Sequence, residues 1–260
     1  MAPCWRWQKG TILMSKKISY LVSTMRHPND IKECLDSILT LPNHNCEIII
    51  YSPAVKDGSY TINGYQIKTI QDTQLSGSVN AFNSAYKQSD GDYICLMIED
   101  LAIPPDFLNV LDWMESDFMK NKVFKIINLS WDGGPGLYTY GHDDLPDGVS
   151  LWDINNPPIS NAIKPYSIIP LPFIDRETIE NKLNGVIFNP IFKHHYVDHW
   201  LGIFASKNET FHPNEWRCPI IGRYKSIKRL SSTNSRYDAH DFKTLNSLAN
   251  EFVMGQTKYA

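Results

Sequence analysis

Two adjacent carboxylates, Glu99 and Asp100, follow the apolar residues 93–98. These apolar residues predict a buried strand, and open α/β sheets bind their ligands at the carboxyl ends of such strands. A carboxylate pair at this place can hold a hard divalent cation such as Mg²⁺ or Mn²⁺. The alternative interpretation is an exposed acidic turn that caps the helix after it.

A run of basic residues lies near the C-terminal end of the chain. Residues 217–236 contain no Asp or Glu and six basic side chains: Arg217, Arg223, Lys225, Lys228, Arg229 and Arg236. Together with the polar residues 231–235, this run predicts a flexible basic loop. Such a loop can clamp a diphosphate on closure, follow a nucleic-acid backbone, or be an ordinary solvated surface.

The composition predicts a soluble globular protein, and the length suits a single α/β domain. The chain has 260 residues, of which 42% are hydrophobic and 20% charged, and its formal net charge is −3. No apolar run approaches the ~20 residues of a membrane span. The near-neutral charge argues against a protein that coats nucleic acid with its whole surface, although an average can hide a patch. Five cysteines without a C-x-x-C pair favour a reducing compartment, so we expect a cytoplasmic location.

Alternating strands and helices must position the carboxylates. Strands at 18–23 and 47–51 flank a helix that begins near Pro28 and ends near Leu39. Such a βαβ unit has a right-handed crossover and implies a parallel sheet. Further elements are expected as strands at 66–70, 92–98 and 123–129 and as helices at 79–88, 106–119, 176–183, 196–205 and 241–252. We expect residues 1–13 to be an extension, and 14–130 and 131–260 to be two halves of one domain.

Several motifs, in a fixed order, carry a resemblance to a known family. They are ISYLVSTMRHPNDIKECLDSIL at 18–39, GSVNAFN at 77–83, GDYI at 91–94, IED at 98–100 and IPPDFL at 103–108. In this order they resemble the glycosyltransferases of the family 2 type, which have the GT-A fold. The resemblance covers residues 18–110 and implies a Rossmann-like, mixed and mainly parallel sheet flanked by helices.

The resemblance implies an activity as well as a fold. Family members move a sugar from a nucleotide sugar, here expected to be a UDP-sugar, to an acceptor hydroxyl. Residues 14–130 would bind the donor and residues 131–260 the acceptor. The IED stretch resembles the metal motif of the family, so Asp100 and Glu99 are the expected ligands of Mn or Mg. His240 is a candidate for an additional late ligand, although a lone histidine is more often a structural or surface group.

The base for an inverting transfer is expected in the segment HHYVDHWL at 194–201. This segment resembles the acceptor-side motif of the family, in which an acidic residue at a helix start acts as the base. Asp198 is therefore the catalytic candidate, and its alternative role is a favourable charge at a helix N-terminus. Arg176 and Trp200 are further candidates for the sugar and acceptor pocket, with aromatic packing as the alternative for Trp200.

The donor site departs from the family pattern in two places. Tyr51 is not followed by the usual acidic pair, and Ile98 replaces the first Asp of the metal motif. Recognition of the nucleobase must then use other groups, such as Ser52, the backbone of Thr24, or Asp72. The residues expected to bind the nucleotide sugar are Ser23, Thr24, Ser52, Asp72, Gly77, Asn83, Glu99 and Arg229.

Other functions are left open by these residues. A carbohydrate is the expected acceptor, but small enzymes of this type also occur in phages, where they glycosylate hydroxymethylated DNA bases in the host cytoplasm. The departures at Ile98 and after Tyr51 also allow a catalytically silent module that binds a sugar or nucleotide. A nucleotidyltransferase ranks last, because residues 23–28 contain no glycine and those enzymes open with a Gly-rich loop.

Overall fold

The computed structural model describes residues 16–42, 44–105, 107–131, 139–140, 166–167, 169, 171–206, 217–218, 231–253 and 259–260. Its main strands are β1 (Lys17–Ser23), β2 (Asn45–Ser52), β3 (Gly58–Ile62), β4 (Tyr65–Gln71), β5 (Tyr93–Ile98), β6 (Ile126–Asn128) and β10 (Pro172–Asp175). They form one seven-stranded sheet in the order β3-β4-β2-β1-β5-β10-β6. Two small two-stranded sheets pair β7 (Ser130–Trp131) with β11 (Arg217–Cys218) and β8 (Thr139–Tyr140) with β9 (Tyr166–Ser167).

The centre of the sheet is parallel. β1 pairs in parallel with both β2 and β5, and β2 pairs in parallel with β4. Two strands that the sequence pattern did not predict run antiparallel: β3 pairs with β4, and β10 lies between β5 and β6. Because β10 comes from the second half of the chain, both halves share one sheet and form a single domain.

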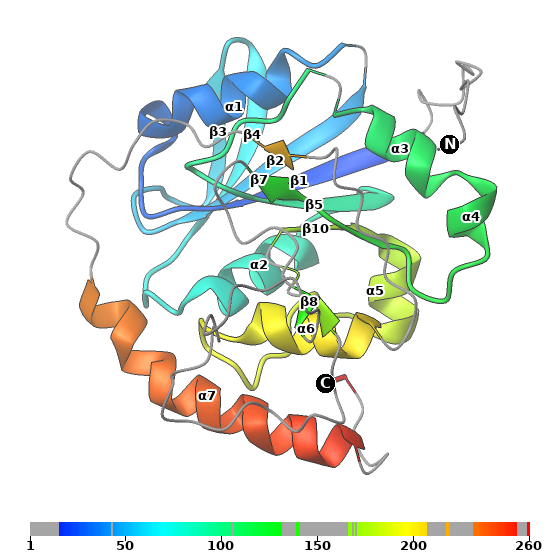
Figure 1. Cartoon of the computed structure of the whole chain (residues 1–260). Coiled ribbons are helices and arrows are strands. Elements are labelled where there is room, and N and C mark those ends of the chain that lie inside the picture. Colours follow the sequence, from blue (N-terminus) through cyan, green and yellow to red (C-terminus); the bar gives the residue numbers. More distant parts are fainter. Residues whose placement is uncertain are drawn as a thin grey trace.

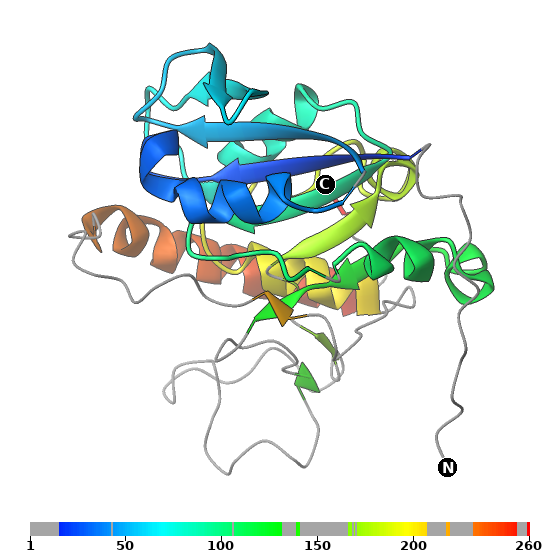
Figure 2. The ribbon, with the colours of Figure 1, turned by 90° about the horizontal axis from the view of Figure 1, so that it is seen from above.

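Helices cover both faces of this sheet. They are α1 (Lys32–Leu39) with the preceding 3-10 turn η2 (Pro28–Ile31), α2 (Ser78–Lys87), α3 (Asn109–Met114), α4 (Asp117–Lys120), α5 (Arg176–Lys182), α6 (Val197–Ser206) and α7 (Ser231–Val253). One hydrophobic cluster joins α1 and α3 to the sheet, and a second joins α2, α5, α6 and α7 to its other face (Figure 1). Seen from above, α1 covers the parallel strands (Figure 2).

The alternation of side chains along β1 explains this three-layer arrangement. Ile18, Tyr20 and Val22 belong to the cluster beneath α1, whereas Leu21 belongs to the cluster on the opposite face. All four side chains have no exposed surface. Successive strand residues point to opposite faces, so a strand that is apolar at nearly every position must be covered on both sides.

Some predicted bounds are wrong. The helix expected at 106–119 is two short helices, α3 and α4, because Ser116 leaves the helical conformation and its side chain caps α4 by accepting from the Met119 N–H. The strand expected at 123–129 is only Ile126–Asn128. α7 is longer than the predicted 241–252, and it includes residues 231–236, which were expected in the basic loop.

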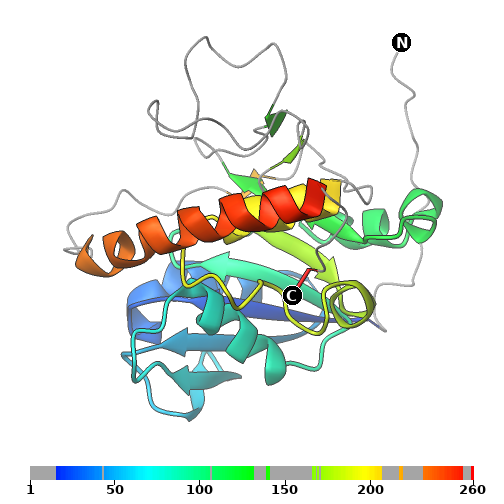
Figure 3. The ribbon, with the colours of Figure 1, turned by 90° about the horizontal axis from the view of Figure 1, so that it is seen from below.

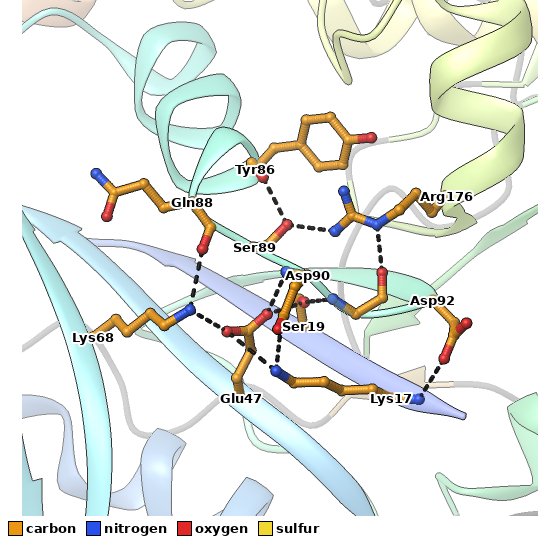
Figure 4. A network of polar contacts seen from close by, with 11 residues as sticks. Lys17, Ser19, Glu47, Lys68, Tyr86, Gln88, Ser89, Asp90, Asp92 and Arg176 are labelled. Atoms are coloured by element: carbon orange, nitrogen blue, oxygen red, sulfur yellow. Dashed lines mark hydrogen bonds and ion pairs between the residues drawn. The ribbon is translucent and has the colours of Figure 1, made fainter. Parts of the chain in front are cut away.

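A polar network ties the amino ends of the strands together, on the edge opposite Glu99 and Asp100. The Glu47 carboxylate accepts from Ser19 Oγ at 2.6 Å, from Lys68 Nζ at 2.7 Å and from the Asp90 N–H at 2.8 Å (Figure 4). The Lys17 ammonium pairs with Asp90 as well, and this contact lowers the pKa of Asp90 to about 2. The amino edge is therefore held together by ion pairs and hydrogen bonds among these side chains.

Arg176 belongs to this amino-edge network. Its Nε donates to the Gly91 carbonyl at 2.6 Å, its terminal nitrogen donates to Ser89 Oγ at 2.8 Å, and its guanidinium lies 4.8 Å from the centre of the Tyr86 ring (Figure 4). The expectation that Arg176 shapes the sugar pocket is thus wrong.

Among the helices that the structure describes, none has the length and apolar character needed to cross a membrane.

Candidate functional site

The predicted donor residues gather at the carboxyl edge of the sheet. Ser23 is the register partner of both Tyr51 and Ile98, so the ends of β1, β2 and β5 lie side by side. The Thr24 N–H donates to the Tyr51 carbonyl at 3.1 Å, and the Asp72 N–H donates to the Ser52 carbonyl at 3.0 Å. The structure therefore brings Ser23, Thr24, Ser52 and Asp72 to the edge that carries Glu99 and Asp100.

The hydroxyls of Thr24 and Ser52 hold the turn after β1. The Arg26 N–H donates to Thr24 Oγ1 at 3.0 Å, and Ser52 Oγ donates to the Arg26 carbonyl at 2.8 Å. Ser52 Oγ also accepts from the Ala54 N–H at 3.1 Å, and Ser52 has no exposed surface. The hydroxyl of Ser52 is thus used by the protein backbone, which gives Ser52 a structural role in shaping the edge.

Asp72 shapes the loop that leads into α2. Its carboxylate accepts from the N–H groups of Gln74 and Ser76 at 3.2 Å and from Ser76 Oγ at 3.1 Å, and the Tyr51 hydroxyl lies 3.4 Å away. Asp72 is 8% exposed. These contacts leave little of its carboxylate for a nucleobase in this conformation, so the observed role of Asp72 is to place the N-terminus of α2.

The N-terminus of α2 meets a segment from the second half of the chain. Gly77 has a φ of +89°, and a Cβ at this position would overlap the carbonyl oxygen of Lys193. The Ser78 N–H donates to His194 Nδ1 and Ser78 Oγ donates to the His194 carbonyl, both at 3.1 Å. The glycine therefore permits a backbone approach that joins the two halves.

Asn83 makes a second connection from α2. Its side-chain oxygen accepts from the N–H groups of Ile187 and Phe188 at 3.1 Å, and its amide donates to the Phe188 carbonyl at 2.7 Å. Asn83 is 7% exposed. Both polar ends of its side chain are bonded to backbone, so the structure gives Asn83 the role of holding this segment.

Substitution of Gly77 by alanine tests the approach of α2 to the second half. We expect Gly77→Ala to lower the free energy of unfolding by about 1–3 kcal/mol, because the residue would need an unfavourable φ and the Lys193 carbonyl would have to move. Urea denaturation of both proteins measures this change.

Gly64 supplies the control for this substitution. It has a φ of +83°, and no atom lies within 4 Å of the place that a Cβ would take. Gly64→Ala therefore carries the backbone strain without the overlap. An equal loss in the two variants would contradict the role given to the Lys193 contact.

Glu99 and Asp100 follow β5 and are largely covered by the protein. Burial raises the pKa of the Glu99 carboxyl, and the nearby charge of Asp100 adds to the rise, whereas Arg26 and the Thr24 hydroxyl oppose it. Asp100 is 8% exposed. Carboxylate oxygens suit Mg²⁺ and Mn²⁺, and Mg²⁺ often takes one or two carboxylates together with substrate phosphates. The oxygen atoms of these two residues are therefore of the kind that suits such a cation.

His240 does not join this carboxylate pair. It lies on α7, and its Nδ1 is 2.9 Å from Asp241 Oδ1. In the part of the chain that the structure describes, no three His, Cys, Asp or Glu side chains come together as a metal site. Asp100 and Glu99 thus stand without a third protein ligand among the described residues.

Arg229, which was predicted to bind the nucleotide sugar, lies outside the described residues.

Asp198 lies in the first turn of α6, at one wall of a pocket of about 360 Å³. The walls include residues of three elements and the turn before α6, among them Ser78, Phe82, Ile98, His194, Tyr196 and Asp198. Ile98 is the last residue of β5, directly before Glu99. The pocket therefore brings the predicted base next to Ile98, at the end of the strand that the predicted cation ligands follow.

The residues after Asp198 support α6. The Asp198 carboxylate accepts from the His199 N–H at 3.0 Å. Burial lowers the pKa of His199, which favours its neutral imidazole, and the charge of Asp198 opposes that change. Trp200 is fully buried and its Nε1–H donates to the Tyr259 carbonyl at 3.1 Å. Trp200 is thus a packing residue, which is the alternative role that its aromatic character allows.

Sequence reasoning missed Asp241, which has no exposed surface. Its carboxylate accepts from the N–H groups of Lys193 at 3.0 Å and of His194 and His195 at 2.8 Å. Figure 3 shows α7, which carries Asp241, alongside α6. The sequence does contain a signal for Asp241. It lies four residues before Leu245, and residues at this spacing share one side of a helix, here the apolar side of α7.

Comparison with known proteins bears on this arrangement. Residues 19–128 match the model of Glycosyl transferase family 2. The matched segment runs from β1 to the end of β6, so it includes the edge that carries Glu99 and Asp100. It ends before α6, and Asp198 therefore lies outside the matched segment.

A curated relative and two solved structures are also similar. Glycosyltransferase GlyA of Streptococcus pneumoniae serotype 4 is 26% identical over 136 residues, which are 49% of this chain and 17% of that protein. Mannosyltransferase PcManGT from Pyrobaculum calidifontis, solved with GDP-Man and Mn²⁺, has a TM-score of 0.55 at 16% identity, over 88% of this chain and 64% of that one. TarS 1-349 of S. aureus, solved with UDP-GlcNAc, has a TM-score of 0.53 at 17% identity, over 81% of this chain and 60% of that one.

These similarities show the fold. The chain has the GT-A fold, with a mixed, mainly parallel sheet flanked by helices in a single domain. It spans less than two thirds of the length of each of these relatives. At 16–17% identity, the two structures carry no conclusion about the donor or acceptor of this chain.

Proposed function

We propose that this protein is a glycosyltransferase that moves a sugar from a nucleotide sugar to an acceptor hydroxyl. The observation that carries the proposal is the pocket of about 360 Å³, which is lined by both Ile98 at the end of β5 and Asp198 at the start of α6. A transfer reaction needs the leaving diphosphate and the acceptor hydroxyl in neighbouring sites. This pocket lies between the end of β5, where the donor would bind, and Asp198, where the acceptor would bind. The first half of the chain would bind the donor and the second half the acceptor.

The donor would bind across the carboxyl edge of the sheet, with Asp100 and Glu99 nearest its diphosphate. A divalent cation held by these carboxylates would stabilise the charge on the departing diphosphate. Manganese is the expected ion, with magnesium as the alternative. The relatives solved with GDP-Man and Mn²⁺ and with UDP-GlcNAc support a nucleotide-sugar donor, and a UDP-sugar is the donor that we propose.

Asp198 would act as the general base of an inverting transfer. The acceptor oxygen forms a bond to the anomeric carbon of the sugar, and its proton passes to the Asp198 carboxylate. The bond from the anomeric carbon to the diphosphate breaks on the opposite face, and the nucleoside diphosphate leaves. The three N–H contacts of Asp241 to residues 193–195 would keep the segment before α6 in place for this step.

A carbohydrate is the proposed acceptor, and hydroxymethylated DNA is the second candidate. The basic run at 217–236 favours the DNA candidate, although most of it lies outside the described residues. Binding to hydroxymethylated duplex DNA, measured as salt is raised from low concentration, separates the two acceptors. Phosphate contacts would give a steep loss of affinity with salt, and a lack of measurable binding at low salt would remove the DNA candidate.

Replacement of Asp100 by asparagine tests the proposed activity. We expect Asp100→Asn to lower the release of nucleotide from a UDP-sugar in the presence of Mn at least about tenfold, because the neutral amide is a weaker ligand for a hard cation. Asp117→Asn is the matched control, since the Asp117 side chain is 98% exposed. The readout is nucleotide release from UDP-, GDP- and CDP-sugars, together with the thermal shift that each sugar causes.

The same assay separates the proposed function from the silent module. Slow nucleotide release by the wild-type protein excludes a module that only binds its ligand. A thermal shift with no release by any of the three donors, with Mn present, would instead support the silent module. Equal rates for the wild type and Asp100→Asn would remove Asp100 from the cation site.

A further inference from the structure

Arg26 lies in the turn after β1, at the same edge as Glu99 and Asp100. Its backbone is held on both sides, because its N–H donates to Thr24 Oγ1 and its carbonyl accepts from Ser52 Oγ. The positive charge of Arg26 interacts electrostatically with the Glu99 carboxylate, which directly follows the end of β5. The guanidinium is therefore near the predicted cation ligands, on a turn that is fixed before any ligand binds.

One nitrogen of the Arg26 guanidinium lacks a hydrogen-bond partner within the described residues. Its Nε is buried and makes no hydrogen bond there. A buried N–H without a partner loses its hydration and gains nothing in return, so it destabilises the fold. Native proteins seldom leave such a donor unsatisfied. At an edge that is suited to a ligand, an acceptor atom of that ligand can satisfy it.

We propose that Arg26 binds the diphosphate of the nucleotide-sugar donor, an inference that rests on the proposed function. Guanidinium groups pair with phosphate oxygens through two parallel N–H bonds. The position suits this role, because the diphosphate must lie against the carboxylates that share its cation.

The sequence around the site gives a reason for an added positive charge. Ile98 stands where the family-like metal motif has its first Asp, so fewer carboxylates are available to hold the cation. A fixed guanidinium would take part of the phosphate charge that the cation otherwise stabilises. Nucleotide binding should then persist in part when the cation is removed.

The test measures the affinity of UDP and of uridine for the wild type and for Arg26→Gln, each with Mn and with EDTA. We expect Arg26→Gln to weaken UDP binding about 10- to 100-fold. Uridine binding should stay unchanged, because uridine has no phosphate. The loss should be larger in EDTA than in Mn, and Arg26→Lys, which keeps the charge but not the paired geometry, should lose less.

The control is Lys32→Gln, which removes one positive charge from the exposed surface of α1. It should bind UDP as the wild type does. Arg26→Gln should also melt without ligand at the wild-type temperature or above it, since the buried Nε that it removes makes no hydrogen bond among the described residues. This separates a ligand role from a structural one that merely balances Glu99.

Three results would overturn the proposal. UDP binding by Arg26→Gln at wild-type affinity excludes contact with the diphosphate. Equal losses of UDP and uridine affinity would place Arg26 at the base or in the fold. A lower melting temperature with unchanged UDP affinity would make Arg26 a counter-ion of Glu99.

If the wild type binds none of UDP, GDP or CDP, the proposed function fails and this inference falls with it.

Discussion

Asp198→Asn is expected to lower kcat by about 10²- to 10⁴-fold, which is the range that a positioned general base contributes. The asparagine amide has nearly the same shape as the carboxylate but cannot take up the proton of the acceptor hydroxyl. The carboxylate accepts from the His199 N–H, and an amide oxygen can keep this bond. We therefore expect the fold and the affinity for the nucleotide sugar to be preserved, so that the loss falls on kcat.

Measurement of transfer to an acceptor, alongside a thermal melt, distinguishes this outcome from unfolding. Glu177→Gln is the matched control, because Glu177 is an exposed carboxylate in the first turn of α5. It removes the same favourable charge from a helix N-terminus, which is worth about 0.3–1 kcal/mol. Wild-type turnover in Asp198→Asn would eliminate Asp198 as the base and leave it as a helix charge only.

The parallel centre of the sheet could be predicted because β1, β2 and β5 contain apolar runs, and because apolar Ile67 and Ile70 mark β4. β1, β2, β4 and β5 each lie within two residues of their expected bounds. β3 was missed because residues 58–62, Gly-Ser-Tyr-Thr-Ile, are mostly polar and mostly exposed, on an edge of the sheet. β10 was missed because it has four residues, begins with Pro172, and pairs with strands more than 40 residues away. Pairings of such separation leave no local signal.

The site was predictable to the extent that it follows from strand ends. Ser23, Ser52 and Glu99 could be placed together because the carboxyl ends of parallel strands share one edge. What each side chain does there depends on contacts from distant segments. Asn83 was expected to bind the donor, yet it holds residues 187–188, and His240 was expected to bind the metal, yet it stands beside Asp241. Arg26 carried no periodic signal at all, since it lies in a turn.

The buried carboxylate of Asp241 should contribute strongly to the stability of the second half of the chain. We expect Asp241→Ala to lower the free energy of unfolding by about 3 kcal/mol or more, because it leaves three backbone N–H groups at residues 193–195 without an acceptor. Asp241→Asn keeps one oxygen and should lose less. Urea denaturation of both variants measures the loss.

The same carboxylate should also affect the chemistry, because residues 193–195 lead directly into the turn that starts α6. We expect Asp241→Asn to lower kcat while UDP affinity changes little, since the donor edge of β1 and β5 is built by other contacts. His240→Gln is the control: its ring is 2.9 Å from the same carboxylate, but its side chain is 53% exposed. Wild-type behaviour of His240→Gln alongside a defect in Asp241→Asn assigns the effect to the buried carboxylate. A defect in His240→Gln that depends on Mn, with Asp241→Asn unaffected, would instead restore His240 as a metal ligand and refute the role given to Asp241.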